Sequence, residues 1–331
     1  MVKIVSLGSA LQDIYLIDHD DLTAAEVHSV RDGKKTIFGN LNFGGKVDID
    51  RISYEVGGGG TNSAVSFARH GHDAVFLGNV GRDIAAQAVL SCLDEEGIDS
   101  SYVQVIPRKH TGSSIVLLDS KSGERTILTY RGASAEFSNL DDAVLEEIQP
   151  DWLYITSLRG DLKTLKRFIS RAKSLKPTTN TTKIMFNPGA LELEQPKELL
   201  KILPSLDILL LNRKEAQQLV PGVMLEELLE KLARYTKTVI ITDGQMGAIA
   251  TDGTDIYRFA IYEDFKVKDT TGAGDAFGSG FLAHFAAGKS FRQSLIFASA
   301  NSSYVITQLG AKRGILTGTE KLHPMPIQKL N

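Results

Sequence analysis

The residues best suited to chemistry in this 331-residue chain lie at 269–281, which read DTTGAGDAFGSGF. Gly272, Ala273 and Gly274 form a short turn before an apparent helix, and Asp275 stands in its first turn. Glycines allow a tight turn and close backbone approach to a ligand, and a helix start presents unpaired N–H groups with a partial positive charge. A phosphoryl group would be well placed at this turn.

Asp275 has two interpretations. Because aspartate is favoured near helix starts, its role can be that of a cap only. Beside an anion site, a carboxylate can also accept the proton of an attacking hydroxyl group, as phosphoryl transfer requires. On this stretch alone, the structural and the catalytic interpretation are equally good.

A second glycine-rich stretch, YEVGGGGTNSAVSFARHG at 54–71, precedes another helix. Polar residues and then an apolar helical face follow the four glycines at once, so a flexible linker is the weaker interpretation. Backbone and amide groups at Gly58 and Asn62 would suit the hydroxyl groups of a polyhydroxylated ligand. Neither stretch matches the P-loop or the Gly-x-Gly-x-x-Gly dinucleotide fingerprint.

Strand and helix patterns alternate along the chain. Short apolar runs bounded by turn residues indicate buried strands at 3–8, 74–78, 152–156, 183–187, 207–211 and 238–242. Apolar residues at helical spacing indicate helices at 62–70, 84–96, 162–173, 225–235 and 293–306. This alternation predicts an α/β fold, with a mainly parallel sheet covered by helices on both sides. Ligands of such sheets bind at the carboxyl ends of the strands.

Two segments leave this alternation. Residues 14–56 are polar and turn-rich, and they end in the alternating run VDIDRISYEV. Residues 110–130 read as a hairpin with its turn at 121–124. Together the segments predict a small β-rich lid, and a long surface loop plus one hairpin is the alternative. The C-terminal stretch HPMPIQKLN is expected to be loosely held.

The composition points to small-molecule partners. The 37 basic and 40 acidic residues give a net charge of −3 without long like-charge runs, which argues against nucleic-acid and membrane-surface binding. The single cysteine, Cys92, cannot form an internal disulfide and is expected to be buried filler, so we expect a reducing, cytoplasmic location. Asp13 interrupts the apolar start of the chain, which we therefore interpret as a first strand and not as a signal peptide.

Several motifs in this order resemble those of one family, the ribokinase-like (PfkB) carbohydrate kinases. Its two signature regions are similar to the glycines at 57–60 with Asn62, Ala64, Ala68, Arg69 and Gly71, and to DTTGAGDAF at 269–277. Further likenesses are Asp13 after the first strand, NRKE at 212–215 and TDGQMGA at 242–248. The resemblance extends over nearly the whole chain.

The resemblance implies an ATP-dependent kinase that phosphorylates an alcohol. It implies a Rossmann-like, three-layer αβα ribokinase-like fold with a small β-sheet lid that often mediates dimers. The α/β core, with the nucleotide and catalytic site, would comprise residues 1–12, 57–109 and 131–331. The lid would comprise residues 13–56 and 110–130, and a homodimer through this lid is an expectation.

Carried over residue by residue, the resemblance makes Asp275 the general base, and it makes the backbone of Gly272, Ala273 and Gly274 the anion hole for the γ-phosphoryl group. The residues expected to bind the substrate are Asp13, Gly58, Asn62 and Arg131. Three of these also have simpler interpretations: Asp13 as a turn cap, Asn62 as an ordinary residue of a helix start, and Arg131 as a residue in solvent.

The resemblance also assigns the cofactor sites. Glu215, with Asn212 and Asn187, would orient Mg²⁺ and its waters near the phosphates of ATP. Asn212 and Glu215 fit a helix capping box equally well. The residues expected to line the nucleotide channel are Thr242, Gly244 and Gly247. Asp269 and Thr271 would hold an activating K⁺.

The acceptor substrate is less well defined. Family members that take phosphosugars tend to carry a lysine where this chain has Gly59, so we expect a neutral sugar, as in ribokinases or fructokinases. A nucleoside is the main alternative, because the length of segment 14–56 is closer to that of adenosine kinases. Tyr130 and Arg131 resemble members that act on 2-keto-3-deoxygluconate, but the arginine expected near FNPG at 186–189 is missing. A sensor without turnover is less consistent with an intact Gly-Ala-Gly-Asp motif.

Overall fold

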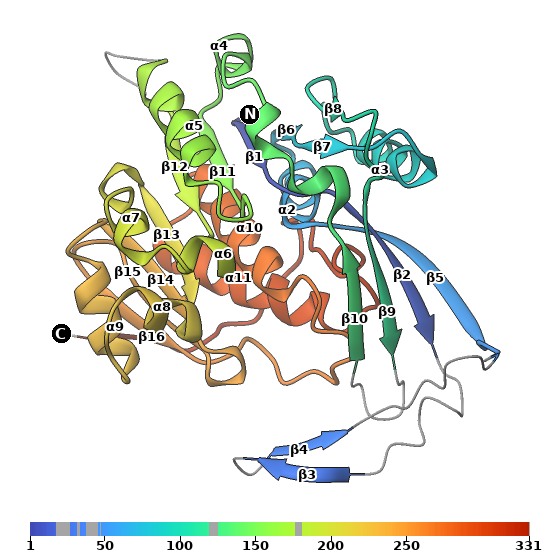
Figure 1. Ribbon diagram of the computed structural model, residues 1–331. Coiled ribbons are helices and arrows are strands. Elements are labelled where there is room, and N and C mark those ends of the chain that lie inside the picture. Colours follow the sequence, from blue (N-terminus) through green and yellow to red (C-terminus); the bar gives the residue numbers. More distant parts are fainter. Residues whose placement is uncertain are drawn as a thin grey trace.

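A nine-stranded sheet forms the middle layer of the molecule (Figure 1). The structure is a computed structural model that describes residues 1–17, 27–31, 34–37, 46, 48–118, 125–175 and 181–330. In spatial order the strands are β17 (Ile327–Leu330), β16 (Ile256–Phe259), β15 (Ala248–Thr251), β14 (Thr238–Thr242), β13 (Ile208–Asn212), β12 (Lys183–Phe186), β11 (Trp152–Ile155), β1 (Lys3–Leu7) and β6 (Asp73–Leu77).

The sheet is mainly parallel, as the sequence predicts. Neighbouring strands run parallel from β6 to β14, and all six predicted strands belong to this part. Strands β15, β16 and β17 add an antiparallel edge that the sequence patterns do not indicate. Parallel strands need a covering layer on each face, which accounts for their nearly continuous apolar runs.

Helices cover both faces of this sheet (Figure 1). One face packs against α2 (Gly59–Arg69), α3 (Ile84–Glu95), α10 (Ala273–Ala286) and α11 (Phe291–Val305). The other packs against α4 (Val144–Ile148), α5 (Leu162–Ser174), α6 (Ala190–Leu193), α7 (Pro196–Leu200), α8 (Arg213–Leu219) and α9 (Leu225–Leu232). Successive strand residues alternate between these layers: Trp152 and Tyr154 of β11 face the first, Leu153 and Ile155 the second. The three-layer α/β fold and the five predicted helices are confirmed.

A four-stranded sheet, called here the lid sheet, lies to one side of the core (Figure 1). Its order is β10 (Arg125–Tyr130), β9 (Gly112–Leu118), β2 (Leu11–Ile17) and β5 (Arg51–Gly57). On its inner face Tyr15, Ile17, Val116 and Leu118 form a small buried cluster. The predicted hairpin is present as the antiparallel pair β9 and β10, whereas its turn at 121–124 and much of segment 14–56 lie outside the described residues.

Two short pairs complete the described strands. They are the antiparallel pair of β3 (Val27–Arg31) with β4 (Lys34–Ile37) and the parallel pair of β7 (Asn79–Val80) with β8 (Gln104–Val105). Among the described residues, no helix has the length and apolar character needed to cross a bilayer.

The expectation of a loosely held C-terminal stretch is wrong. Residues of β17 pair with β16 along its whole length, from Ile327 opposite Phe259 to Leu330 opposite Ile256. Met325, just before the strand, is buried in the core. Without β17, β16 would be the edge of the sheet, and its unpaired backbone groups would be available to pair with an extended segment. The local composition of the tail does not reveal this pairing.

The order of the sheet reverses at β1, which lies between β6 and β11. In α/β sheets this reversal opens a crevice at the carboxyl ends of the two diverging strands. The start of α2 enters this crevice, because a Cβ at Gly8 after β1 would lie 2.0 Å from Oγ1 of Thr156 and 3.0 Å from Cα of Gly60. The glycine at position 8 therefore allows α2 to approach the strand ends closely.

Candidate active site

The first turns of α2 and α10 meet at the crevice. Asn62, which is 4% exposed, donates a hydrogen bond from Nδ2 to Oδ2 of Asp275 over 2.8 Å. A Cβ at Gly59 would lie 3.1 Å from the side chain of Thr156 and 3.2 Å from Oδ1 of Asp275. The structure thus brings together the two glycine-rich stretches, which are about 200 residues apart in the sequence.

The start of α10 is open. Gly272 has a left-handed backbone (φ 78°) and caps the helix without a side-chain hydrogen bond. A Cβ at Gly274 would have no neighbouring atom within 4 Å. Such a turn leaves backbone N–H groups accessible to an anionic ligand.

Burial raises the pKa of Asp275, and the hydrogen bond from Asn62 and the positive charge of Lys312 act against this rise. The carboxylate therefore binds a proton more readily than an exposed aspartate does. Its described hydrogen-bond partner is a side chain of another helix, which distinguishes it from a simple cap of α10.

The carboxylate of Asp13 lies against the glycines that precede α2. A Cβ at Gly57 would come within 1.9 Å of Oδ2 of Asp13, and Gly58 adopts a backbone conformation (φ 99°) that residues with side chains avoid. Burial raises the pKa of Asp13, while the hydroxyl group of Ser114 and the charge of Lys312 lower it. The glycines thus make room for a buried carboxylate next to the start of α2.

Arg131 follows β10 and is exposed. Partial burial and the neighbouring guanidinium of Arg159 lower its pKa, and the charge of Asp13 acts in the opposite direction. Arg159 lies just after β11 and has a positive φ of 59°, which is unusual for a residue with a side chain. Buried Glu192 braces this loop, because its carboxylate accepts hydrogen bonds from Ser157 and from the N–H of Gly160.

A cavity of about 280 Å³ lies on the other side of the α10 turn. It brings together four of the predicted cofactor residues and two residues of the predicted anion hole, namely Asn212, Thr242, Gly244, Gly247, Ala273 and Gly274. Its apolar walls include Phe259 and Phe277. A cleft of this size, apolar with a few polar groups, is typical of a small-molecule site.

Comparisons with known proteins identify the family of the chain. The sequence profile described as pfkB family carbohydrate kinase matches residues 1–317. The chain belongs to the pfkB family of carbohydrate kinases. It is 28% identical to the ribokinase of Lactococcus lactis over 95% of this chain and 94% of that protein.

Two solved structures share the fold of this pfkB kinase. The ribokinase of Thermotoga maritima superposes with a TM-score of 0.72 at 24% identity, covering 95% of each chain. The adenosine kinase of Sinorhizobium meliloti gives a TM-score of 0.76 at 21% identity, covering 96% of this chain and 98% of that one. The protein is therefore a phosphotransferase that acts on a sugar hydroxyl group, and kinases of its family use ATP and a divalent metal.

The residues predicted to serve the divalent metal have clear structural roles as well. Oδ1 of Asn212 accepts from the N–H of Glu215 at 3.0 Å, and Oε2 of Glu215 accepts from the N–H of Asn212 at 2.8 Å. These two hydrogen bonds form the capping box that the sequence also predicts, and the box starts α8. Nδ2 of Asn187 donates to the carbonyl of Leu210 in the middle of β13, 3.0 Å away.

This donor set suits Mg²⁺ held mainly by phosphates and water. The described residues contain no group of three or more His, Cys, Asp or Glu side chains arranged to hold a metal ion. Burial raises the pKa of Glu215, and its bonds with Asn212 lower it. Mg²⁺ in kinases is usually bound by one or two carboxylates together with substrate phosphates and waters, so Glu215 and its neighbours fit such a site.

Asp269 is almost completely buried just before the α10 turn. Oδ1 accepts from the N–H and the hydroxyl group of Thr271 at 2.9 and 2.7 Å, and Oδ2 accepts from Tyr15 at 2.7 Å and the N–H of Gly310 at 3.1 Å. Nη1 of Arg125 on lid strand β10 lies 3.4 Å from Oδ1. Burial alone would raise the pKa of Asp269, but these hydrogen bonds lower it below its usual value.

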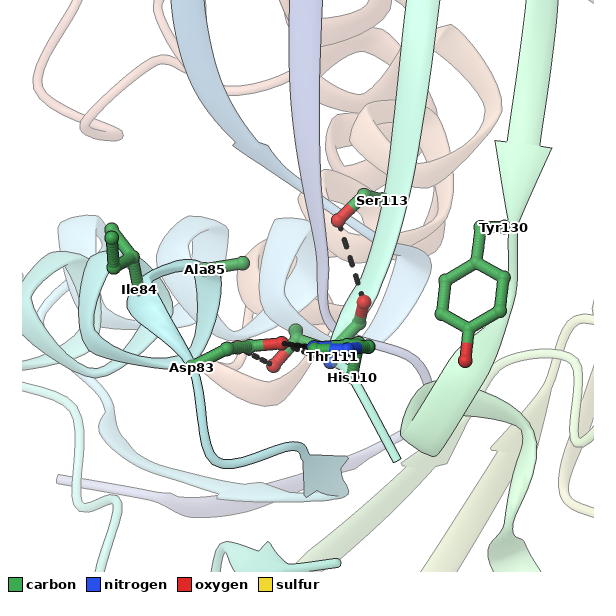
Figure 2. Close-up of a pocket in the computed structure, with 7 residues that line it drawn as sticks. All are labelled: Asp83, Ile84, Ala85, His110, Thr111, Ser113 and Tyr130. Atoms are coloured by element: carbon green, nitrogen blue, oxygen red, sulfur yellow. Dashed lines mark hydrogen bonds and ion pairs between the residues drawn. The ribbon is translucent and has the colours of Figure 1, made fainter. Parts of the chain in front are cut away.

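A second cavity, of about 570 Å³, lies where α3 begins beside the lid sheet (Figure 2). Its polar centre is Asp83, which caps α3 through Ala86 and also accepts from the N–H and hydroxyl group of Thr111. His110 is 3.2 Å from the same carboxylate. These bonds tie the helix to strand β9, and none of the predicted site residues lines this cavity.

Sequence reasoning missed Lys312, whose ammonium group lies beside Asn62 in this pfkB kinase. The lysine stands in GAKRG at 310–314, beyond the end of α11, and no periodicity or motif spacing there singles it out. The lysine is followed by Arg313, so the local sequence reads as an ordinary basic pair in a loop.

Proposed function

We propose that the protein transfers the γ-phosphoryl group of ATP to a hydroxyl group of a small sugar, with Asp275 as the general base. The observation that carries this proposal is the position of Asp275 between two regions. On one side is the cavity lined by Ala273 and Gly274, and on the other are the buried polar groups of Asp13 and Asn62.

In this proposal Asp13, Asn62 and the backbone at Gly58 hold the sugar hydroxyl groups, and Asp275 accepts the proton of the attacking hydroxyl group. A raised pKa makes its carboxylate a stronger base than an exposed aspartate. The N–H groups of Gly272, Ala273 and Gly274 stabilise the charge that develops on the transferring phosphoryl oxygens.

The remaining predicted residues serve the nucleotide. Thr242, Gly244 and Gly247 would line the path of ATP, as their place in the 280 Å³ cavity supports. Asn187, Asn212 and Glu215 would hold Mg²⁺ and its waters. When bound, this ion neutralises phosphate charge.

The acceptor is tested by an ATP-consumption screen over pentoses, hexoses, keto-deoxy sugar acids and nucleosides. We expect the highest kcat/KM with a neutral pentose or hexose. The panel includes sugar acids because the guanidinium groups of Arg131 and Arg159 lie near each other and near Asp13. Their positive charges would favour an acidic acceptor. A preference for nucleosides would replace the sugar with the second candidate, and no turnover on any acceptor would favour a sensor.

The expected K⁺ at Asp269 and Thr271 remains a prediction that the local geometry does not favour. Both carboxylate oxygens of Asp269 already accept hydrogen bonds, and the guanidinium of Arg125 supplies a positive charge next to one of them. Because this guanidinium would repel a cation at the same oxygen, we infer that Arg125 provides the charge expected from K⁺.

We also propose that the lid sheet, within segments 13–56 and 110–130, closes over the substrate and forms a homodimer through its outer face. On that face Tyr54, Ile14, Ile115 and Leu128 stand directly opposite one another on the four strands. Three of them, Tyr54, Ile115 and Leu128, are exposed. A row of apolar side chains, most of them exposed, across a sheet is characteristic of an interaction surface.

A further inference from the structure

Lys312 is a buried cation without an ion-pair partner among the described residues. The residue is 7% exposed, and no described carboxylate lies within 4 Å of its ammonium group. Nζ instead donates to the carbonyl of Val56 at 2.5 Å, to Oγ1 of Thr61 at 3.0 Å and to Oδ1 of Asn62 at 2.6 Å. Burying an ammonium group among neutral partners is costly, so this position calls for a reason other than stability.

The three acceptors match the three N–H donors of an ammonium group. All of them belong to the segment that carries the glycine cluster and the first turn of α2. A lysine can only donate, so it selects the oxygen end of the Asn62 amide. The opposite end, Nδ2, then faces Asp275 and donates to Oδ2 at 2.8 Å.

The loop that carries Lys312 is fixed on both sides. Nη1 of Arg69 on α2 donates to the carbonyl of Lys312 at 2.7 Å, and Arg69 also pairs with Glu96 at 2.5 Å. On the other side, a Cβ at Gly272 would lie 2.3 Å from Cβ of Ala311. The loop therefore packs against the anion-hole turn while its lysine reaches the glycine cluster.

We propose that Lys312 is a positioning residue for phosphoryl transfer, because it fixes the orientation of Asn62 that holds Asp275 toward the acceptor hydroxyl group. This inference rests on the proposed role of Asp275. Without the lysine, the amide of Asn62 is free to turn its oxygen toward the carboxylate. The base would then lose its donor and face a second acceptor.

The test is a comparison of Lys312→Met, Asn62→Ala and the double variant, measured with ATP and the best acceptor from the screen. We expect Lys312→Met to lower kcat about 10- to 100-fold, since it removes a charged donor from this hydrogen-bond chain. The KM for ATP is expected to stay close to that of the wild type, because Lys312 does not line the nucleotide cavity.

The double variant distinguishes positioning from general damage. If Lys312 acts through Asn62, Lys312→Met on the Asn62→Ala background causes little further loss of kcat. Full additivity of the two losses would overturn the proposal, as would an unchanged kcat in Lys312→Met. Lys312→Gln, which keeps one donor for the amide, is expected to recover part of the rate, and it serves as the test protein if the Met variant does not fold.

Two further variants complete the design. Arg313→Met changes the adjacent, exposed residue of the same loop and is expected to leave kcat unchanged. Asp275→Asn separates the two proposals: if it abolishes transfer while Lys312→Met is fully active, the role of Lys312 fails and the kinase mechanism stands. If the wild type transfers phosphate to no acceptor, both proposals fail.

Discussion

The hydroxyl group of Tyr15 donates to Oδ2 of Asp269 over 2.7 Å, joining lid strand β2 to the turn that starts α10. Arg125, on lid strand β10, approaches the other oxygen of the same carboxylate. Asp269 is therefore the point at which two lid strands are anchored to the anion-hole turn. Movement of the lid and the geometry of this turn are expected to be coupled through it.

This anchoring predicts that catalysis depends little on the monovalent cation. Rates measured in equal concentrations of KCl, NaCl and choline chloride are expected to agree closely for the wild type, because Arg125 already supplies a positive charge at Asp269. Arg125→Met is expected to be slower and to gain rate from K⁺. The exposed Arg108→Met is the matched control. Strong K⁺ activation of the wild type would instead support the cation site at Asp269 and Thr271.

Replacing the proposed base, Asp275, tests its role in phosphoryl transfer separately from the binding of ATP. Asp275→Asn is expected to lower kcat roughly 10²- to 10⁴-fold, because the amide cannot accept the proton of the acceptor hydroxyl group. Calorimetric titration with ATP and Mg²⁺ is expected to give nearly the wild-type affinity. Asp94→Asn, which neutralises an exposed carboxylate on α3, controls for the change in charge. An Asp275→Asn enzyme with near wild-type kcat would show that the base is another group.

The sequence predicts the parallel part of the fold well, because strands buried on both faces carry continuous apolar runs such as residues 152–156. The antiparallel strands β15, β16 and β17 escape this pattern. Each of them has only four residues. β16 and β17 are partly buried, and β17 has a single neighbour in the sheet, so their residue types are weakly constrained. Pairing with β16, and not local composition, orders the C-terminal stretch.

For the candidate site, sequence motifs locate the two glycine-rich turns but not the contacts between them. Asn62 and Asp275 stand out because each lies beside a recognisable turn. Lys312 carries no such local mark, since its importance arises from a contact across about 250 residues. Asn212 and Glu215 show a further limit of sequence-based prediction. The same spacing is found in a helix capping box and in a metal site, so the sequence cannot distinguish the two.

Lys312 also predicts a loss of activity at alkaline pH. Burial lowers its pKa to about 8, and the charges that face it are those of Asp13, Asp275 and Arg69, with the thiol group of Cys92 nearby. Above that pH the neutral amine has only two donors for three acceptors, so the orientation of Asn62 weakens. We expect kcat to fall as the pH rises through about 8.

The matched variant for this pH dependence is Lys312→Met. Its lower kcat is expected to show no decline in that range, because the titrating group has been removed. Parallel measurement of the assay's coupling enzymes excludes their own pH dependence. An identical alkaline decline in both proteins would assign the titration to a different residue.

The outer face of the lid sheet predicts an oligomeric state. Leu128→Lys places a charge on a side chain that is 53% exposed in the apolar row, and it is expected to convert a dimer into a monomer. Val223→Lys changes another exposed apolar residue, 65% exposed, between α8 and α9, and is expected to leave the dimer intact. Light scattering coupled to size exclusion measures both. A monomeric wild type would contradict the proposed interface.

A pair of partly buried histidines predicts lower stability in mild acid. His284 stacks on Phe297 with 3.9 Å between ring centres, and its Nδ1 has no described hydrogen-bond partner. Burial and, to a smaller extent, the charges of neighbouring His70 and Lys289 together lower the pKa of His284 to about 4, against the opposing charge of Glu320. Burial likewise lowers the pKa of His70.

The direction of this pH effect follows from the protonation of His284 in the unfolded and in the folded protein. The unfolded protein takes up a proton at His284 near pH 6.5, whereas the folded protein resists protonation until about pH 4. The contribution of His284 to the free energy of unfolding is therefore complete above pH 6.5 and is lost as the pH falls toward 4. Solvent screening of this partly exposed ring limits the loss to on the order of 1–2 kcal/mol.

Thermal unfolding at about pH 7.5 and about pH 5 tests this expectation with His284→Phe. The aromatic ring preserves the stacking on Phe297 but cannot be protonated, so the drop in Tm between the two pH values is expected to be smaller than in the wild type. His110→Gln, which removes an exposed histidine, is expected to retain the full drop. If His284→Phe loses as much Tm in acid as the wild type does, another buried histidine such as His70 is the group whose protonation destabilises the fold.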